Sequence, residues 1–230
     1  MEENRKTAFM VGVLFIIGTV AGVLSLLVTG PVLNAPDYLV KIAEKQNQLI
    51  LGSLLVLVMS FALAFVPVMM FPVFKKRNEI VALGYLIIRG ALETVTYLGG
   101  AIGWLMLVAL SQAYLQASPV NAASFEVLGN MLLKEAEISS QLTAIVFPLG
   151  ALLFYYGLFQ QRLIPRWLSV WGIIAVLMHL ISTGLLGLFA MIDPMSPVQF
   201  ALNFPIFLQE MVMAVWLIVK GFNPSASHRI

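Results

Sequence analysis

Four ionisable side chains lie inside long apolar stretches of this chain: Arg89, Glu93, His179 and Glu210. Arg89 and Glu93 are spaced i, i+4, so on a helix they share one face, and Tyr97 continues that face by one more turn. Ionisable groups within an apolar span typically mark ion, proton or substrate sites. We therefore treat these five residues as candidate binding residues. Arg89 is expected to be an anion anchor or counter-ion with Glu93 as its orienting partner, and Glu210 the titrating group with His179 as a proton relay beside it.

The elements that must position these side chains are membrane helices. Hydrophobic residues make up 60% of the 230 residues, and charged residues only 10%. A soluble domain carries roughly 25% charged residues. So few charges cannot cover a surface that faces water. The composition therefore predicts a polytopic membrane protein whose main partner is the lipid bilayer.

Composition and motifs also exclude several other classes. The chain has no cysteine and two histidines, so neither a disulfide nor a zinc–thiolate site is expected, and we predict no metal and no cofactor. A net charge of +2 is too small for a nucleic-acid partner. The metalloprotease motif H-E-x-x-H and the hydrolase motif G-x-S-x-G are absent from the sequence. An enzyme, such as one that modifies lipids within the membrane, is therefore the least favoured of three function classes.

Six stretches are long and apolar enough to cross a bilayer, which takes about 20 residues. They are residues 8–29, 49–74, 80–111, 138–159, 167–191 and 200–219. The predicted fold class is thus all-α, a bundle of six transmembrane helices that forms a single domain over residues 1–230. Between the spans, residues 37–47 and 124–137 combine charges with apolar side chains. Both are expected to form short amphipathic helices at the outer surface.

The distribution of basic residues predicts the orientation, because cytoplasmic loops are enriched in lysine and arginine. With the N-terminus inside, nine basic residues are cytoplasmic, three are outside, and Arg89 is the thirteenth. The cytoplasmic set is Arg5, Lys6, Lys75, Lys76, Arg77, Arg162, Arg166, Lys220 and Arg229, and the outer set is Lys41, Lys45 and Lys134. We therefore predict that both termini are cytoplasmic.

The candidate residues share one depth in the predicted bundle. At about 1.5 Å per residue from the nearest predicted helix end, Arg89 and Glu210 lie about 15 Å deep, His179 about 18 Å and Glu93 about 21 Å. The hydrocarbon is about 30 Å thick, so all four lie near its middle. Each charge there costs at least about 2.5–3.5 kcal/mol. We therefore expect Arg89, Glu93 and Glu210 to turn toward one another, or toward a wet cavity, between the third and sixth spans.

Besides the enzyme, two functions remain open at this point. One arginine cannot neutralise two carboxylates, so one acid is available to exchange a proton. That favours the binding of a small molecule or ion, or proton-coupled transport. The same residues also suit a structural staple in a membrane scaffold or accessory subunit, and His179 also suits a hydrogen-bonded packing role. The sequence does not set the oligomeric state.

Three stretches carry a family resemblance: RGALETVTY (89–97), LIPRWLSVWG (163–172) and LQEMVMAVWLIVKGFNPSA (208–226). With the opening GVLFIIGTVAGVLS (12–25), they resemble a bacterial multi-pass membrane family, domain of unknown function family 4386. The resemblance covers essentially the whole chain. It implies a location in the bacterial cytoplasmic membrane, and it implies no activity, substrate or catalytic residue.

Overall fold

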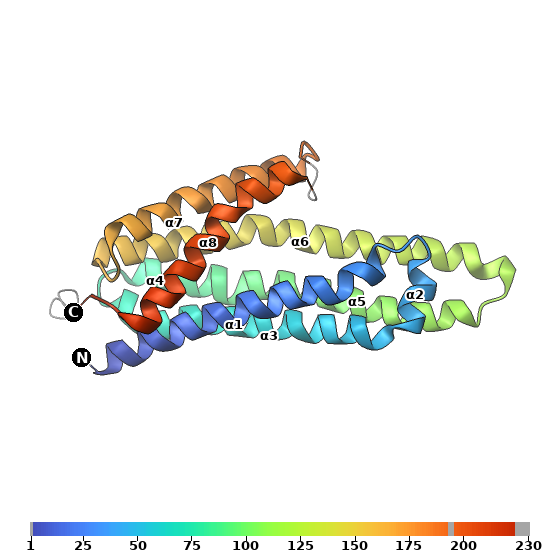
Figure 1. Ribbon diagram of the computed structural model, residues 1–230, viewed down its shortest axis with the longest axis horizontal. Coiled ribbons are helices and arrows are strands. Elements are labelled where there is room, and N and C mark those ends of the chain that lie inside the picture. Colours follow the sequence, from blue (N-terminus) through green and yellow to red (C-terminus); the bar gives the residue numbers. More distant parts are fainter. Residues whose placement is uncertain (1, 193–195, 224–230) are drawn as a thin grey trace. The chain divides into compact units, whose positions relative to one another are not determined.

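The computed structural model describes residues 2–192 and 196–223, and these are almost entirely helical (Figure 1). The elements are α1 (Glu2–Leu33), α2 (Tyr38–Glu44), α3 (Gln46–Lys75), α4 (Glu79–Tyr85), η1 (Leu86–Leu92), α5 (Glu93–Leu115), α6 (Pro119–Gln161), α7 (Arg166–His179), η2 (Leu180–Leu186) and α8 (Pro197–Val219), where η1 and η2 are π-helices. No strand occurs in the described residues. Arg229 and residues 224–226 of the third resembling stretch lie outside the described residues.

Six helices of the described chain are long and apolar enough to cross a membrane. They cover residues 4–33, 46–75, 79–115, 120–161, 166–186 and 197–219. The third combines α4, η1 and α5, and the fifth combines α7 and η2. These helices confirm the predicted fold class, an all-α membrane protein with six spans.

The fourth span differs from its prediction. The α6 helix runs without a break from Pro119 to Gln161, so the separate surface helix expected over residues 124–137 is wrong. That segment contains no proline, and its apolar side chains continue the helix into the following span. The segment 37–47 does form a separate helix, α2, which buries Leu39 and Ile42. The fifth span ends earlier than residue 191, because the chain turns at Ala190, where φ is +52°.

The chain divides into two compact units, which we describe separately. Unit 1 comprises Met1–Ile17, Phe61–Thr94 and Gln141–Ile230, and unit 2 comprises Gly18–Ser60 and Val95–Ser140. The chain passes from one unit to the other inside α1, α3, α5 and α6. Four of the five candidate residues fall in unit 1: Arg89, Glu93, His179 and Glu210. The fifth, Tyr97, falls in unit 2.

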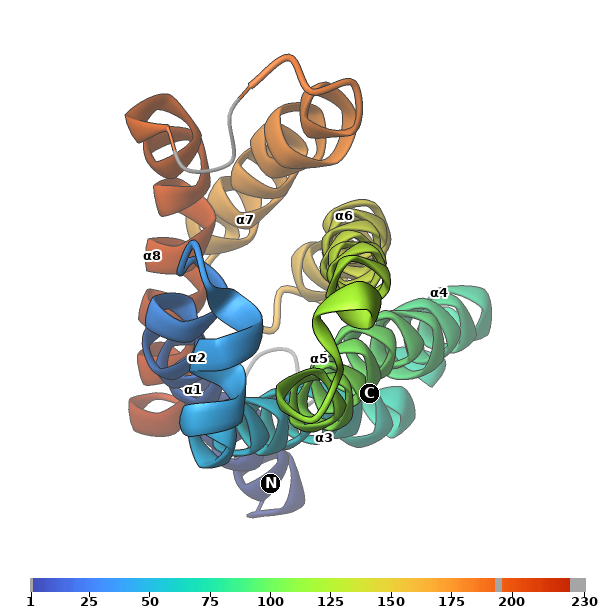
Figure 2. The same ribbon diagram turned by 90° about the vertical axis from the view of Figure 1, so that its right-hand side faces the viewer.

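Unit 2 has a small apolar core to which four helices contribute. Val32 of α1, Ile42 of α2, Leu49 of α3 and Leu107 of α5 pack together there, and each is at most 1% exposed. Figures 1 and 2 show α2 between the end of α1 and the start of α3. The short helix α2 therefore closes this core rather than lying loose on the surface.

Unit 1 packs α7 beside α8 (Figure 1). It also holds a cluster of buried aromatic rings. Tyr85 of α4 stacks on Phe154 of α6 with ring centroids 5.2 Å apart, and Phe74 and Phe15 pack against Phe154 at 6.1 and 5.6 Å. All four side chains are fully buried. Such ring contacts add to the free energy gained from burial, and here they join α1, α3, α4 and α6.

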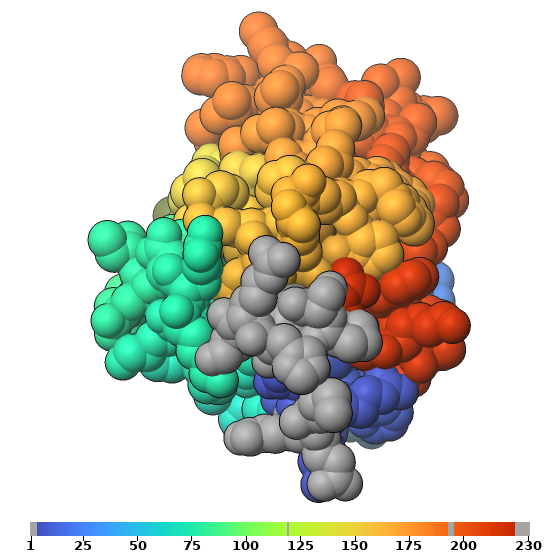
Figure 3. Space-filling view, turned by 90° about the vertical axis from the view of Figure 1, so that its left-hand side faces the viewer, coloured from blue at the N-terminus to red at the C-terminus, as the bar shows by residue number. Residues whose placement is uncertain are grey.

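The ends of α1 and α8 meet on one face of unit 1 (Figure 3). The Arg5 guanidinium group donates to the carbonyl oxygens of Leu217, Ile218 and Val219 at 3.1, 2.8 and 3.2 Å. These carbonyls belong to the last turn of α8, where that of Leu217 also accepts from the N–H of Gly221 at 3.1 Å. A cation is favourable there because of the helix dipole. Arg5 thus caps α8.

Candidate binding site

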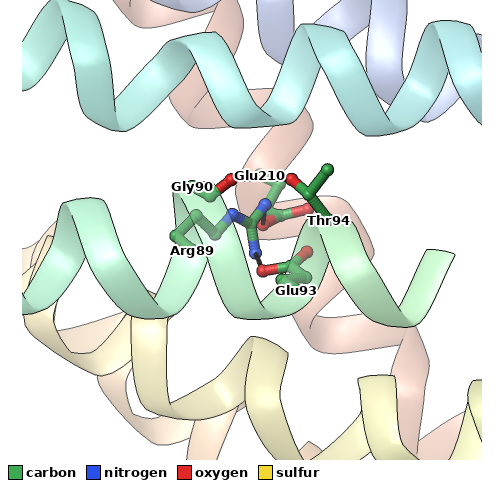
Figure 4. A network of polar contacts seen from close by, with 5 residues as sticks. All are labelled: Arg89, Gly90, Glu93, Thr94 and Glu210. Atoms are coloured by element: carbon green, nitrogen blue, oxygen red, sulfur yellow. Dashed lines mark hydrogen bonds and ion pairs between the residues drawn. The ribbon is translucent and has the colours of Figure 1, made fainter. Parts of the chain in front are cut away.

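Three charged side chains lie together in unit 1, as Figure 4 shows. Nη1 of Arg89 is 3.2 Å from Oε2 of Glu93, and Nη2 of Arg89 is 3.9 Å from Oε1 of Glu210. The Arg89 side chain is 3% exposed, that of Glu93 1% and that of Glu210 16%. The structure therefore brings together the three charged residues that were expected to pair because an isolated charge is costly in a bilayer. Their role as a binding site stays a prediction.

The π-helix η1 sets the positions of Arg89 and Glu93. The Glu93 N–H donates to the carbonyl of Ile88, five residues back, and the Thr94 hydroxyl donates to the carbonyl of Gly90 at 2.8 Å (Figure 4). Single π-helical turns within α-helices occur often at functional sites. Here the wider turn carries the arginine, and a side-chain hydroxyl satisfies one of its carbonyl groups.

Close approach of α6 accompanies this wider turn. A Cβ atom on Gly150 of α6 would lie 3.1 Å from Cβ of Arg89 and 3.3 Å from its Cα and backbone nitrogen. Only a glycine lets the backbone of η1 approach α6 this closely without displacement. The position of Arg89 is therefore fixed by its backbone as well as by its ion pairs.

Aromatic rings surround the guanidinium group. Cζ of Arg89 lies 4.7 Å from the centroid of the Phe147 ring and 5.9 Å from that of Phe15. A guanidinium group within about 6 Å of a ring centroid is attracted to the ring face. Phe147 of α6 and Phe15 of α1 thus both contribute cation–π attraction to the guanidinium group of Arg89.

A buried hydroxyl group completes the surroundings of the cluster. Tyr85 precedes Arg89 by four residues and is 1% exposed. Its hydroxyl has no hydrogen-bond partner among the described residues. A buried polar group without a partner costs about 1–3 kcal/mol. The burial of this hydroxyl therefore carries a cost that none of its described neighbours offsets.

Gln209, the neighbour of Glu210 in the chain, fastens α8 to two helices. Its Oε1 accepts from the Tyr155 hydroxyl at 2.5 Å, and its Nε2 donates to the carbonyl of Leu168 at 3.0 Å. Gln209 and Tyr155 are fully buried. The segment of α8 that carries Glu210 is therefore tied to both α6 and α7.

His179 belongs to a second polar network in unit 1. Its Nδ1 lies 2.9 Å from Oδ1 of Asn203, which also accepts from the Thr183 hydroxyl at 2.8 Å. Thr183 in turn accepts from Nε2 of Gln199. Because the asparagine oxygen is an acceptor, Nδ1 of His179 carries the hydrogen. Nε2 is then the acceptor atom of the neutral ring.

The second π-helix, η2, lies in this network. Nε2 of Gln141 on α6 donates to the carbonyls of Thr183 and Gly184 at 2.7 and 2.8 Å. The Gly187 N–H reaches back five residues to the carbonyl of Ser182. Sequence reasoning missed Gln141, although a glutamine at the start of an apolar stretch was a usable signal.

The structure also places the remaining candidate, Tyr97, and three residues that sequence reasoning missed. Tyr97 is half-buried on α5 in unit 2, so the site described here consists of unit 1 residues. Phe147, Phe15 and Gly150 surround Arg89, yet the sequence holds 15 phenylalanines and 17 glycines and nothing in it distinguishes these three.

Fold and cluster together define a polytopic helical membrane protein with a charged group buried in its third and sixth spans. The chain belongs to the family described as Domain of unknown function (DUF4386), which matches residues 10–221. The resemblance noted from the sequence is thereby confirmed. No curated protein and no solved structure gives a match.

Proposed function

We propose that this protein binds a small anionic solute at Arg89 and carries it through the membrane together with a proton taken up by Glu210. We further propose that it does so in the bacterial cytoplasmic membrane, with both termini on the cytoplasmic side. The observation that carries the proposal is the difference between the two acids that share one arginine. Glu93 is buried in close contact with Arg89, whereas Glu210 lies farther from Arg89 and is partly exposed.

The charge count supports exchange at this site. When all three groups are ionised, one guanidinium faces two carboxylates, and the cluster carries one net negative charge. An uncompensated charge is costly inside a bilayer. One proton on a carboxylate removes that charge without moving any residue, so a proton is a natural co-substrate.

Exposure and distance indicate which acid exchanges the proton. Glu93 is 1% exposed and contacts Arg89 at 3.2 Å, whereas Glu210 is 16% exposed and lies at 3.9 Å. A longer contact and greater exposure make an ion pair easier to open. Glu210 is therefore the proton-exchanging group in this proposal, and Glu93 keeps Arg89 in place.

Competition for Arg89 would couple the solute to the proton. A guanidinium group offers donors in a planar fork that fits a carboxylate or a phosphate. A solute anion that binds Nη2 takes the place of Glu210, which then loses its counter-charge and accepts a proton. The Tyr85 hydroxyl, which lacks a partner among the described residues, adds a hydrogen bond to the same solute. Anion and proton thus enter together, and net charge is conserved.

The test is proton entry into liposomes that contain the purified protein and an internal pH-sensitive dye. The probes are succinate and inorganic phosphate at neutral pH, added outside one at a time. We expect at least one probe to acidify the interior with the wild-type protein and none to do so with Glu210→Gln. Glu79→Gln is the matched control, because Glu79 is an exposed acid of the same unit. Probe-driven proton entry that survives in Glu210→Gln contradicts the proposal.

The structural staple remains the second candidate because of one observation. The Arg89–Glu93 pair is almost fully buried, and Gln209 already ties α8 to α6 and α7. If no probe binds to or is moved by the folded wild-type protein, and Glu210→Gln only lowers the yield, a scaffold or accessory subunit is the better conclusion. Tyr85→Phe separates the two candidates, because it removes a solute contact but no hydrogen bond within the described residues.

A further inference from the structure

A shallow hollow runs along one side of α8 toward its C-terminal end. Its lining consists of Met211, Val212, Val215, Trp216, Val219 and Lys220. These positions repeat at i, i+4 and i+8, so they form one stripe on the helix. Five of the six are apolar, and the lysine lies at the end of the stripe.

This stripe faces away from the core of unit 1. On the other side of α8, Met213, Ala214 and Leu217 are fully buried, whereas Val215 and Val219 in the hollow are 53% and 62% exposed. Because α8 is one of the six spans, an exposed apolar stripe on it lies in contact with hydrocarbon.

The polar end of the hollow carries positive charge. Lys220 is exposed, and the Arg5 guanidinium group lies beside it, bonded to the last carbonyls of α8 at 2.8–3.2 Å. Both cations therefore lie where the apolar stripe ends. An anionic group at this end of the hollow meets Lys220, which lines it, and the apolar side chains follow directly.

The length of the hollow fits one leaflet of a bilayer. From residue 211 to residue 220 the helix rises about 14 Å at about 1.5 Å per residue. Half of a hydrocarbon layer of about 30 Å is about 15 Å. A lipid whose phosphate lies at Lys220 would therefore extend one acyl chain along the whole stripe.

We propose that this hollow, the α8 lipid site, binds one anionic phospholipid. The phosphate group lies at Lys220, with the charge of Arg5 at the same end of α8, and an acyl chain packs along Val212, Val215 and Val219. This inference does not depend on the function proposed for Arg89 and Glu210.

A second copy of the chain fits this surface less well than a lipid. Two copies in one membrane have the same orientation, and a two-fold axis brings the same residues of both copies together. An α8–α8 contact would place Lys220 beside Lys220 and Arg5 near Arg5. Like charges repel, whereas a phosphate group neutralises them.

Native mass spectrometry of the full-length protein in detergent tests the site. The probes are phosphatidylglycerol and phosphatidylcholine with the same acyl chains. We expect the wild-type protein to retain one phosphatidylglycerol in preference to phosphatidylcholine. Lys220→Gln should reduce that preference about fivefold, which is the effect of one basic residue near an anionic surface. Val215→Trp fills the hollow without changing charge and should weaken the retention of both lipids.

Lys76→Gln is the matched control, because it removes one positive charge from another exposed lysine of unit 1, outside the hollow. It should leave the retained lipid unchanged. An equal loss of preference in Lys76→Gln and Lys220→Gln would mean diffuse attraction to a charged surface and would overturn the proposal. A dimer that Val215→Trp dissociates, with lipid retention unaffected, would identify a copy of the chain as the occupant and would also overturn it.

Discussion

Neutralising the three buried charges one at a time should destabilise the protein by unequal amounts. Glu210→Gln leaves Arg89 paired with Glu93, and Glu93→Gln leaves it paired with Glu210. Arg89→Met instead leaves two carboxylates in a buried site and removes the cation that they share. The expected order of destabilisation is therefore Arg89→Met, then Glu93→Gln, then Glu210→Gln.

The magnitudes follow from distance and burial. At an effective dielectric constant of about 20, unit charges attract by about 5 kcal/mol at 3.2 Å and about 4 kcal/mol at 3.9 Å, the distances of the two ion pairs. Desolvation offsets most of either attraction. Because the attractions differ by only about 1 kcal/mol, burial decides between the acids. Arg89→Met should cost about 3–5 kcal/mol, Glu93→Gln about 1–3 kcal/mol and Glu210→Gln less than about 1 kcal/mol.

The assay is the free energy of unfolding in mixed detergent micelles, with the wild-type protein and Glu79→Gln measured alongside. Glu79 pairs with Lys75 in an exposed position, so its change should fall within about 0.5 kcal/mol. A cost for Glu210→Gln that equals the cost for Arg89→Met would refute the reasoning, because Glu210 would then be as firmly held as the arginine. An Arg89→Met variant as stable as the wild type would refute the pairing itself.

Three further perturbations test the packing and the polar networks. In thermal unfolding, Gly172→Ala should cost about 1–3 kcal/mol, because the added Cβ would lie 2.5 Å from two ring carbons of Tyr155. Gly30→Ala is the control and should be neutral or stabilising, because the atom nearest to its Cβ would be 3.9 Å away. Thr183→Val removes a hydroxyl that bonds two amide side chains and should cost about 1–3 kcal/mol by the same measurement. Burial and a nearby glutamate raise the pKa of Tyr38 above its ordinary value of about 10. The neutral hydroxyl of Tyr38 therefore contributes its full stabilisation below about pH 10, and this stabilisation is lost as the pH rises through the raised pKa. Tyr38→Phe should flatten the alkaline loss of stability in a melting-temperature series against pH.

The charged cluster was predictable because the cost of a charge in hydrocarbon leaves few arrangements. Arg89, Glu93 and Glu210 each had to find a partner, and their equal depth identified the partners. The same reasoning could not place residues 124–137, because an amphipathic segment fits a helix that rests on a surface as well as one that continues a span. The two alternatives differ in whether the helix breaks before Pro148, and the structure shows one continuous helix.

The π-helices could not be predicted, since each is accompanied by a close contact between helices that one sequence does not reveal. Gly150 lets α6 approach the backbone of Arg89, and a Cβ on Gly184 would lie 2.9 Å from the carbonyl oxygen of Ala144. Neither glycine differs in sequence context from the others in the spans. A periodic apolar pattern specifies a helix, but it does not reveal one extra residue within a turn.

The two polar networks of unit 1 meet at one ring, and that contact constrains how a proton can move. Phe147 faces Arg89 at 4.7 Å, and its ring centroid lies 5.3 Å from that of His179 with the ring planes at 83°. A phenyl ring carries no exchangeable hydrogen, so no proton passes between the networks through Phe147. On its other side, Nδ1 of His179 and the Thr183 hydroxyl both donate to the oxygen of Asn203, and the amide of Gln199 donates to the Thr183 hydroxyl. A relay needs an acceptor that can also donate, and the amide oxygen cannot. The relay role of His179 stays a prediction, and a proton passed by this ring would move through Nε2 rather than through Nδ1. Through Asn203, His179 also links α7 to α8, and the proton exchange proposed for Glu210 needs a route other than the Phe147 ring.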